Sequence, residues 1–397
     1  MSINLAFPAT PPPQATRETR TDVAATHKQA KQRDLRLDFF RGLALFFIFI
    51  DHIPDNVLSW FTLHDFAFCD AAEMFIFISG YTAALAYAPV FDREGVAMGI
   101  ARIYRRVWQL YVAHIFLFMI FSAEVAYTMR VRSNPLFADE LAIGDYLSGQ
   151  GEAFIRVLLL QFQPNLLNIL PLYIALLLGL PYLLLLMRRN VLLGLIPSAV
   201  LWVLATQLNW NMPGYPDGRL WYFNPFAWQF LFAIAVALGF LRENVPWPRG
   251  LTTASAVFAA VACVVAVNWA LSSAFPGIPN LFPLPSAWFD KTSLPPLRII
   301  SILSLAVLVA GRVPKNARWF SSRAGWPVVI CGQHSLEVFC LTIVLAVLAN
   351  FVLSLSGYSL LSQLTVNVAG LAIMVLFALL LTWFRSGGRW PRRLDPA

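Results

Sequence analysis

The sequence predicts an all-α protein, a polytopic integral membrane helical bundle of about ten transmembrane helices with both termini in the cytoplasm. Hydrophobic residues make up 58% of the 397 residues and charged residues only 13%, whereas soluble domains carry about 25% charged residues. Several apolar stretches approach the roughly twenty residues that cross a hydrocarbon core of about 30 Å as a helix. These observations exclude a soluble enzyme and a protein with a single membrane anchor.

The order of the predicted elements follows from polarity along the chain. Residues 1–36 are polar, proline-rich and basic, and are predicted to form a disordered cytoplasmic tail. The first apolar stretch begins near Leu37, too late for a cleaved signal peptide, so it should remain as the first span. Residues 37–386 are predicted to form the transmembrane domain, and residues 387–397 a basic cytoplasmic tail. The predicted spans are 37–58, 66–88, 104–127, 168–187, 190–208, 223–241, 251–272, 296–311, 327–355 and 360–384.

The positions of the basic residues predict the orientation. With the N-terminus inside, 23 of the 29 lysines and arginines fall in cytoplasmic segments. The other six are Arg130, Arg132, Arg156, Arg219, Lys291 and Arg298. This excess is typical of an even number of spans with both ends in the cytoplasm. The net charge of +8 therefore indicates membrane orientation, and no nucleic-acid partner is expected.

The remaining composition limits the kinds of site. Trp210, Tyr222 and Trp288 lie in predicted outer segments, where they form either an interfacial belt, the commoner case, or a stacking floor for sugar rings. The four cysteines lie in or beside apolar runs, so no disulfide framework is expected. The five histidines form no clustered ligand set, and nucleotide-binding loops are absent from the sequence. No metal and no permanently bound cofactor is therefore expected.

The predicted first span carries ionisable residues, which are costly near the centre of a bilayer and are therefore candidate functional residues. Arg41 and His52 are eleven residues apart, so they share one helical face about 16 Å apart. We expect Arg41 near the cytoplasmic boundary and His52 in the outer half. A snorkelling anchor and a packed histidine are the structural alternatives. A histidine near carboxylates can accept the proton of a sugar hydroxyl that attacks a thioester.

Carboxylates near His52 are candidate catalytic partners. Asp51 is adjacent in sequence and points about 100° away, so a carboxylate from another span is the better candidate to orient the ring. Asp70 and Glu73 share one face of the second span, and Glu73 is the deeper of the two. Ser79-Gly80 in the same span indicates close helix packing.

Further polar residues are predicted on the cytoplasmic side. Arg102 and Arg105 share a face next to Arg106, an arrangement suited to a phosphorylated ligand, although membrane anchoring explains single arginines equally well. His334 and Glu337 lie one turn apart in the ninth span and either line a donor tunnel or form a structural pair. His114 is interpreted as a packed histidine.

Three segments resemble the OpgC family, integral-membrane proteins that succinylate osmoregulated periplasmic glucans, within the acyltransferase-three superfamily. They are residues 35–56 (LRLDFFRGLALFFIFIDHIPDN), 59–63 (SWFTL) and 70–84 (DAAEMFIFISGYTAA). The superfamily pattern of an arginine, ten residues and a histidine falls on Arg41 and His52, and its arginine pair falls on Arg102 and Arg105. The resemblance implies that His52 is catalytic and that these arginines lie on the donor side.

The resemblance also implies an activity and partners. It indicates an O-acyltransferase of the bacterial inner membrane that moves a succinyl or similar group from cytoplasmic acyl-CoA, its co-substrate, to hydroxyls of periplasmic glucans. The lipid bilayer and the glucan-synthesis machinery are further expected partners. His52 and the donor-side arginines are expected to open into one passage through the bundle. An O-acetyltransferase of another cell-surface polysaccharide, a glycan transporter that makes no bond and a scaffolding subunit remain alternatives.

Overall fold

The described residues of the computed structural model are helical. They are residues 34–132, 143–144, 146, 150–241, 248–315 and 317–388, and they contain α-helices, short 3₁₀ helices and one isolated β-bridge, between Pro213 and Leu220. The predicted all-α class is therefore confirmed. The four cysteines are free. The predicted tails, 1–36 and 387–397, lie almost entirely outside the described residues.

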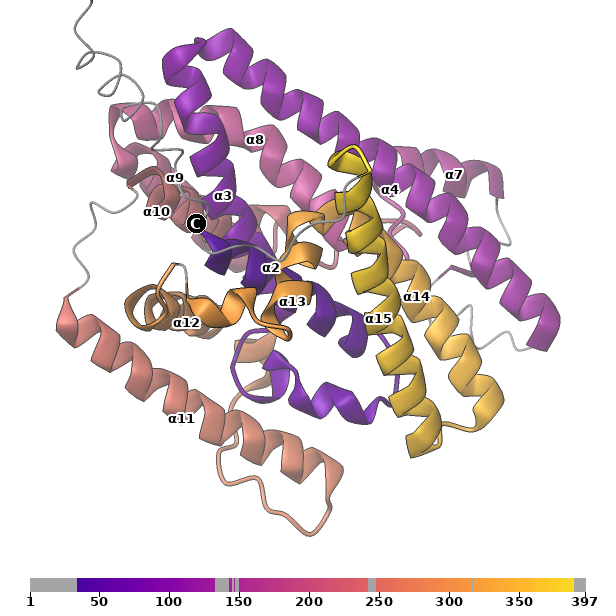
Figure 1. Ribbon diagram of the computed structural model, residues 1–397. Helices are drawn as coiled ribbons and strands as arrows, with labels where there is room; N and C mark the ends of the chain where they lie inside the picture. Colours follow the sequence, from indigo (N-terminus) through magenta and orange to yellow (C-terminus); the bar gives the residue numbers. More distant parts are fainter. Residues whose placement is uncertain are drawn as a thin grey trace, which may run out of the picture. The chain divides into compact units, whose positions relative to one another are not determined.

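Each predicted span corresponds to one helix or, in one case, to two. The α-helices, shown in Figure 1, are α2 (Leu35–Asp51), α3 (Ala71–Arg93), α4 (Val96–Arg132), α7 (Gln150–Leu158), α8 (Ile169–Arg189), α9 (Val191–Gln207), α10 (Pro225–Leu241), α11 (Arg249–Ala274), α12 (Pro296–Arg312), α13 (Gly325–Gln333), α14 (Ser335–Ser356) and α15 (Leu360–Arg385). The 3₁₀ helices are η1 (Val57–Phe61), η2 (Leu63–Asp65), η4 (Ser286–Phe289) and η5 (Arg318–Ser321).

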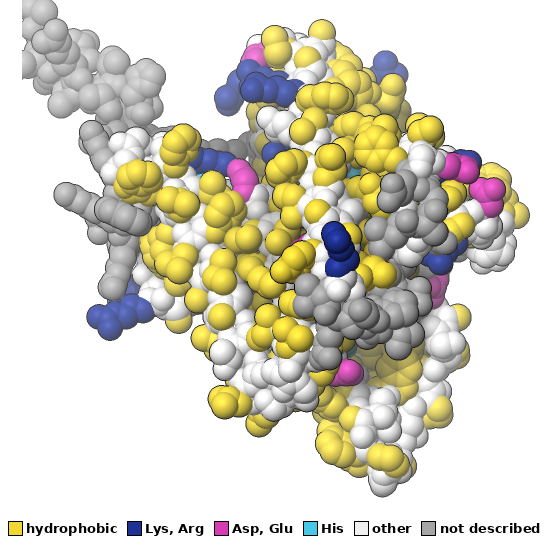
Figure 2. All heavy atoms as spheres, turned by 90° about the vertical axis from the view of Figure 1, so that its right-hand side faces the viewer, with side chains coloured by type: hydrophobic (Ala, Val, Ile, Leu, Met, Phe, Trp, Pro, Cys, Tyr) yellow, Lys and Arg dark blue, Asp and Glu magenta, His cyan; other side chains and the backbone are white. Residues whose placement is uncertain are grey.

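Helix length and composition identify a helical membrane protein. Six described helices, α3, α4, α8, α11, α14 and α15, are long and apolar enough to cross a membrane. The predicted count of about ten is not reached by this criterion, because α2, α9, α10 and α12 have 17 residues each. Such a helix is about 26 Å long, slightly short of a hydrocarbon core. The face in Figure 2 is covered largely by hydrophobic side chains, with few charged ones.

The helix bounds differ from the prediction at the candidate site. The predicted span 37–58 ends as a helix at Asp51, so His52 lies in the turn that follows. Pro54 disfavours helical geometry just before it. The amide Nδ2 of Asn56 also donates to the Ile50 carbonyl at 2.9 Å and satisfies a carbonyl at the helix end.

Two other predicted elements differ from the structure. The predicted span 327–355 is two helices, α13 and α14, separated at His334. The predicted outer loop 128–167 contains the end of α4 and the helix α7, while residues 133–142 lie outside the described residues. With 37 residues, α4 is about 55 Å long and extends well beyond a hydrocarbon core.

Close backbone contacts hold α2 in the bundle. Helix α2 packs against α3, α13, α14 and α15. A Cβ added at Gly42 would lie 1.9 Å from the carbonyl oxygen of Val328 in α13, and one at Gly332 would lie 1.8 Å from that of Asp38. In α3, a Cβ added at Gly80 would lie 2.8 Å from the carbonyl oxygen of Phe232 in α10, which confirms Ser79-Gly80 as a packing position. Glycine therefore sets how closely these helices approach.

The contact between α2 and α13 predicts the effect of adding one methyl group. Gly42→Ala should lower the unfolding temperature in detergent, because the methyl overlaps the Val328 carbonyl and over-packing costs about 1–3 kcal/mol. The matched control is Gly179→Ala in α8, where no described atom lies within 4 Å of an added Cβ. Because alanine favours helix, the control should unfold at the same or a higher temperature. Equal unfolding temperatures for the two variants would contradict the close contact.

Candidate functional site

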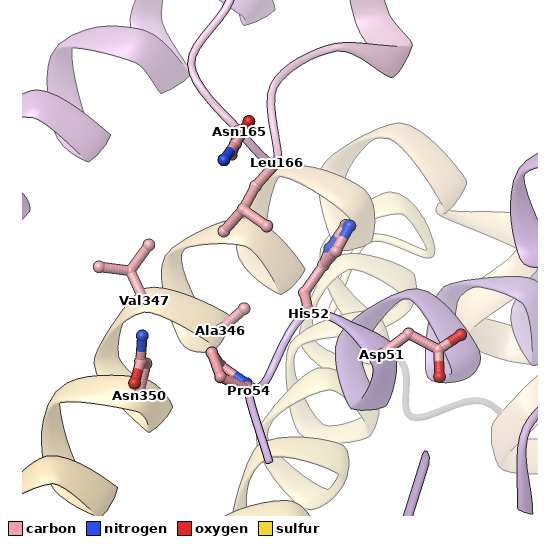
Figure 3. Close-up of a pocket in the computed structure, with 8 residues that line it drawn as sticks. All are labelled: Asp51, His52, Pro54, Asn165, Leu166, Ala346, Val347 and Asn350. Carbon is pink, nitrogen blue, oxygen red and sulfur yellow. The ribbon is translucent and has the colours of Figure 1, made fainter. Parts of the chain in front are cut away.

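A cavity of about 190 Å³ lies at the C-terminal end of α2 (Figure 3). We call it the His52 cavity. Its lining residues are Asp51, His52, Pro54, Asn165, Leu166, Ala346, Val347 and Asn350. They come from the turn after α2, the segment before α8 and the second half of α14. The cavity therefore combines one imidazole and two amide side chains with an apolar wall.

The imidazole of His52 has no hydrogen-bond partner among the described residues. Its Nδ1 is buried, and the only hydrogen bond of the residue runs from its backbone N–H to the Ile48 carbonyl at 3.1 Å. The carboxylate expected to orient the ring does not contact it in this structure. Buried polar atoms in native structures are nearly always paired. The unpartnered ring is therefore the kind of group that a bound ligand completes.

Asp51 binds a different histidine. In Figure 3 its carboxylate points away from the His52 ring, as its place in the sequence predicts. Its Oδ1 accepts from Thr62 Oγ1 at 2.6 Å and lies 3.5 Å from His64 Nδ1. The hydrogen bond to Asp51 raises the pKa of His64, an effect that partial burial opposes. Asp51 therefore holds the 3₁₀ segments η1 and η2 against the end of α2.

Asp70 and Glu73 belong to a buried ion cluster, defined by these two residues with Lys291 and Arg298. Asp70 caps the N-terminus of α3 by accepting from the Ala72 N–H at 2.8 Å, and Glu73 accepts from the Asp70 N–H at 2.9 Å. Arg298 of α12 donates to Glu73 Oε1 at 2.6 Å and to Asp70 Oδ2 at 3.1 Å. Lys291 forms an ion pair with Asp70. The cluster thus joins the start of α3 to α12.

The ion cluster balances two carboxylates with two cations. Glu73 is fully buried and Arg298 nearly so. Burial alone would lower the pKa of Lys291, but the Asp70 carboxylate beside it raises this pKa. Sequence reasoning counted Lys291 and Arg298 only as basic residues outside the membrane, because no pattern links them to partners more than 200 residues away.

A second cavity of about 190 Å³ contains Arg41 and Arg106. We call it the Arg41 cavity. Arg41 donates to Thr82 Oγ1 at 2.7 Å, and Arg106 donates to Gln109 Oε1 at 3.3 Å. Its other walls come from α3, α8 and α14 and include Phe75, Tyr173 and Phe339. Two guanidinium groups at one cavity are suited to an anionic ligand.

The other predicted donor-side residues lie outside the two cavities. Arg102 is half-exposed and pairs with Glu94 at 2.5 Å, and Arg105 is exposed. His334 Nε2 contacts Thr382 Oγ1 at 2.7 Å. Glu337 accepts from Arg385 at 2.5 Å, so both residues hold α14 to α15. Ser335, next to His334, does line the Arg41 cavity. His114 is fully buried, which confirms the packed interpretation.

The two cavities lie along the same helices but are separate. Arg41 lies in α2 and His52 in the turn that follows this helix, and Leu45 and Ile48 lie between them at helical spacing from Arg41. On α14, Ile343 lies between the Phe339 and Ala346 positions. Leu45 and Ile343 are 0% exposed and Ile48 is 7% exposed. Among the described residues, buried side chains thus lie between the positions that line the two cavities, where the sequence predicted one open passage.

A network of uncharged polar side chains supports the turn that carries His52, and sequence reasoning missed it. The amides of Asn56 and Asn367 donate to each other at 3.1 and 2.9 Å. Gln363 Oε1 accepts from the Val57 N–H at 2.8 Å. The sequence did contain one indication of this network, because Gln363 and Asn367 are polar residues four apart within an apolar span.

Comparison with known families finds a match over most of the chain. The model of the family described as OpgC protein matches residues 33–386. The chain belongs to the OpgC family. Membership implies an acyltransferase-type activity on glucans, and the matched region includes both cavities and the ion cluster. A search of curated proteins finds no match.

The ion cluster predicts a large effect of removing one cation. Arg298→Met should lower the stability by about 3–5 kcal/mol, because it leaves Glu73 buried without its partner. Arg102→Met is the matched control, since its pair with Glu94 is exposed and such pairs contribute at most about 1 kcal/mol. Thermal unfolding in detergent measures both variants. Similar small shifts for the two would contradict a stabilising role of the cluster.

Proposed function

We propose that the protein is a membrane O-acyltransferase that moves a succinyl or similar acyl group from cytoplasmic acyl-CoA to hydroxyls of periplasmic glucans, with His52 as general base. The observation that carries the proposal is the His52 cavity, where a buried imidazole lacks a hydrogen-bond partner among the described residues. Membership of the OpgC family supports the reaction class. Two amides in the same cavity favour an uncharged, hydroxyl-rich acceptor.

The proposed transfer follows from ordinary thioester chemistry. A glucan hydroxyl oxygen attacks the thioester carbonyl carbon while the imidazole of His52 takes the hydroxyl proton. The carbon–sulfur bond then breaks, and the sulfur leaves with the bonding electron pair. The proton passes from His52 to that sulfur, so the products are a glucan ester and the thiol form of CoA. The atoms, electrons and proton of this transfer are all accounted for without a metal or a further reactant.

The Arg41 cavity is the proposed position of the donor. Arg41 and Arg106 supply guanidinium groups for an anion, either the free carboxylate of a succinyl group or a CoA phosphate. Arg102 and Arg105 are exposed near the same end of α4 and suit the phosphates of a donor that arrives from solvent. His334 and Glu337 lie at the start of α14, next to Ser335 of the cavity wall, and would line the path of the donor.

The proposed topology has ten spans in the bacterial inner membrane, with both termini in the cytoplasm. Six long helices and four helices of 17 residues supply this number. The excess of basic residues in the predicted cytoplasmic segments supports the orientation. It would put His52 toward the periplasm and Arg41 toward the cytoplasm. Acyl transfer then requires the buried side chains of Leu45, Ile48 and Ile343 to move apart. The glucan-synthesis machinery would supply the acceptor.

His52→Ala tests the proposed chemistry. Purified protein given succinyl-CoA and periplasmic glucan should release free thiol and add an ester to the glucan. His52→Ala should reduce both by at least about 100-fold, because a general base contributes roughly 10²–10⁴-fold. His114→Leu is the matched control and should retain activity, since this buried histidine makes no hydrogen bond to the described residues. The unfolding temperature should be the same in all three proteins.

Two results would contradict this function. Normal acylation by His52→Ala would remove His52 from the mechanism. Wild-type protein that releases no thiol would favour a transporter or a scaffolding subunit, while an acetyl ester formed only from acetyl-CoA would favour the acetyltransferase alternative.

A further inference from the structure

Asn350 is a buried amide on the wall of the His52 cavity. It lies in the second half of α14 and is 3% exposed. Its Oδ1 accepts a hydrogen bond from the Tyr358 hydroxyl at 2.8 Å. Its Nδ2 has no hydrogen-bond partner among the described residues. Figure 3 shows this nitrogen on the side of Val347 and the oxygen on the opposite side. Asn350 therefore offers two N–H donors at the cavity.

The orientation of Asn350 is fixed by the turn between α14 and α15. Gly357 and Tyr358 both adopt left-handed backbone conformations, with φ of 72° and 56°. The Tyr358 carbonyl accepts from Gln363 Nε2 at 2.8 Å, and Gln363 also binds the Val57 N–H close to His52 in the chain. Because Tyr358 is held in this way, its hydroxyl holds the Asn350 oxygen away from the cavity. The amide nitrogen is thus a positioned donor.

The chemistry of the cavity identifies the class of ligand. An amide N–H donates to an uncharged oxygen such as a hydroxyl. Asn165, on a different wall, adds a second amide group. The cavity of about 190 Å³ is smaller than the roughly 300–1,000 Å³ of typical small-molecule sites. It therefore suits one ring of a neutral sugar, with the rest of the chain outside.

The position of Asn350 along α14 favours the acceptor over the donor. Phe339 lines the Arg41 cavity, and Ala346 and Asn350 line the His52 cavity. Of these three residues of α14, Asn350 therefore lies farthest from the Arg41 cavity, about 16 Å along the helix from Phe339. An acyl group delivered from the Arg41 cavity would reach the His52 region before it reached Asn350.

We propose that the His52 cavity binds one glycosyl ring of the acceptor and that Asn350 donates a hydrogen bond to a hydroxyl of that ring. This contact sets which neighbouring hydroxyl is presented to His52. The inference rests on the proposed acyltransferase function and adds the acceptor subsite to it. Asn350 binds and positions the acceptor and takes no part in proton transfer.

The test compares the kinetic parameters for the two substrates. With purified periplasmic glucan and succinyl-CoA, Asn350→Leu should raise the KM for glucan on the order of tenfold, the loss expected for one or two hydrogen bonds. The KM for succinyl-CoA and the kcat at saturating glucan should change by less than about twofold, because transition-state contacts remain. NMR of the product should show a changed distribution of ester positions.

Two further variants separate binding from folding. Tyr358→Phe leaves the cavity wall intact but frees the amide, so it should raise the KM for glucan about threefold, in the same direction. Asn268→Ala, at a partly buried amide on α11 outside both cavities, is the matched control and should change neither KM. Thermal unfolding in detergent reports the stability of each variant.

Each alternative outcome has a distinct meaning. An unchanged KM for glucan in Asn350→Leu, with or without a loss of stability, overturns the acceptor subsite while leaving the proposed function intact. A rise in the KM for succinyl-CoA instead assigns the cavity to the donor and also overturns it. Wild-type protein that transfers no acyl group overturns both the proposed function and this inference.

Discussion

The constraint on which the structure depends is that a polar group removed from water must find a partner. Most buried ionisable side chains meet it within the bundle: Arg298 balances Asp70 and Glu73, and this ion cluster joins α3 to α12. Two groups at one cavity do not, because the His52 ring and the amide nitrogen of Asn350 lack partners among the described residues. A ligand bound in this cavity would supply hydrogen bonds to both groups.

Helix α2 connects the two cavities. It carries Arg41 to one cavity and ends at the turn that places His52 in the other, and its contact with α13 at Gly42 allows little movement there. Leu45 of α2 and Ile343 of α14 are fully buried and lie between the positions of these helices that line the two cavities. Changes of side-chain conformation and small helix shifts are therefore the motions that could connect the two cavities, while the ion cluster holds α3 to α12 and the polar network holds the His52 turn to α15.

The sequence predicted what depends on local pattern. Apolar stretches and their charged ends located the long helices, although α2 ends seven residues before the predicted bound and α4 begins eight residues before it. The spacing of Arg41 and His52 identified a residue at each cavity. Partners distant in the chain were not predictable, because no sequence pattern pairs Glu73 with Arg298. The end of α2 likewise depends on Asn56, which is hydrogen-bonded to Asn367 of α15. Asn350 was missed because an uncharged amide in an apolar span carries little sequence signal, and the burial of Leu45 and Ile343 depends on tertiary contacts.

In the proposed function, the donor and the acceptor bind at opposite ends of one helical bundle. The most direct measurement uses sealed proteoliposomes with periplasmic glucan trapped inside and radiolabelled succinyl-CoA added outside. Protein whose N-terminus faces the added succinyl-CoA should label the trapped glucan, and sealed vesicles with the opposite orientation should give no label. Label that appears only when both substrates are on the same side of the membrane would contradict this arrangement.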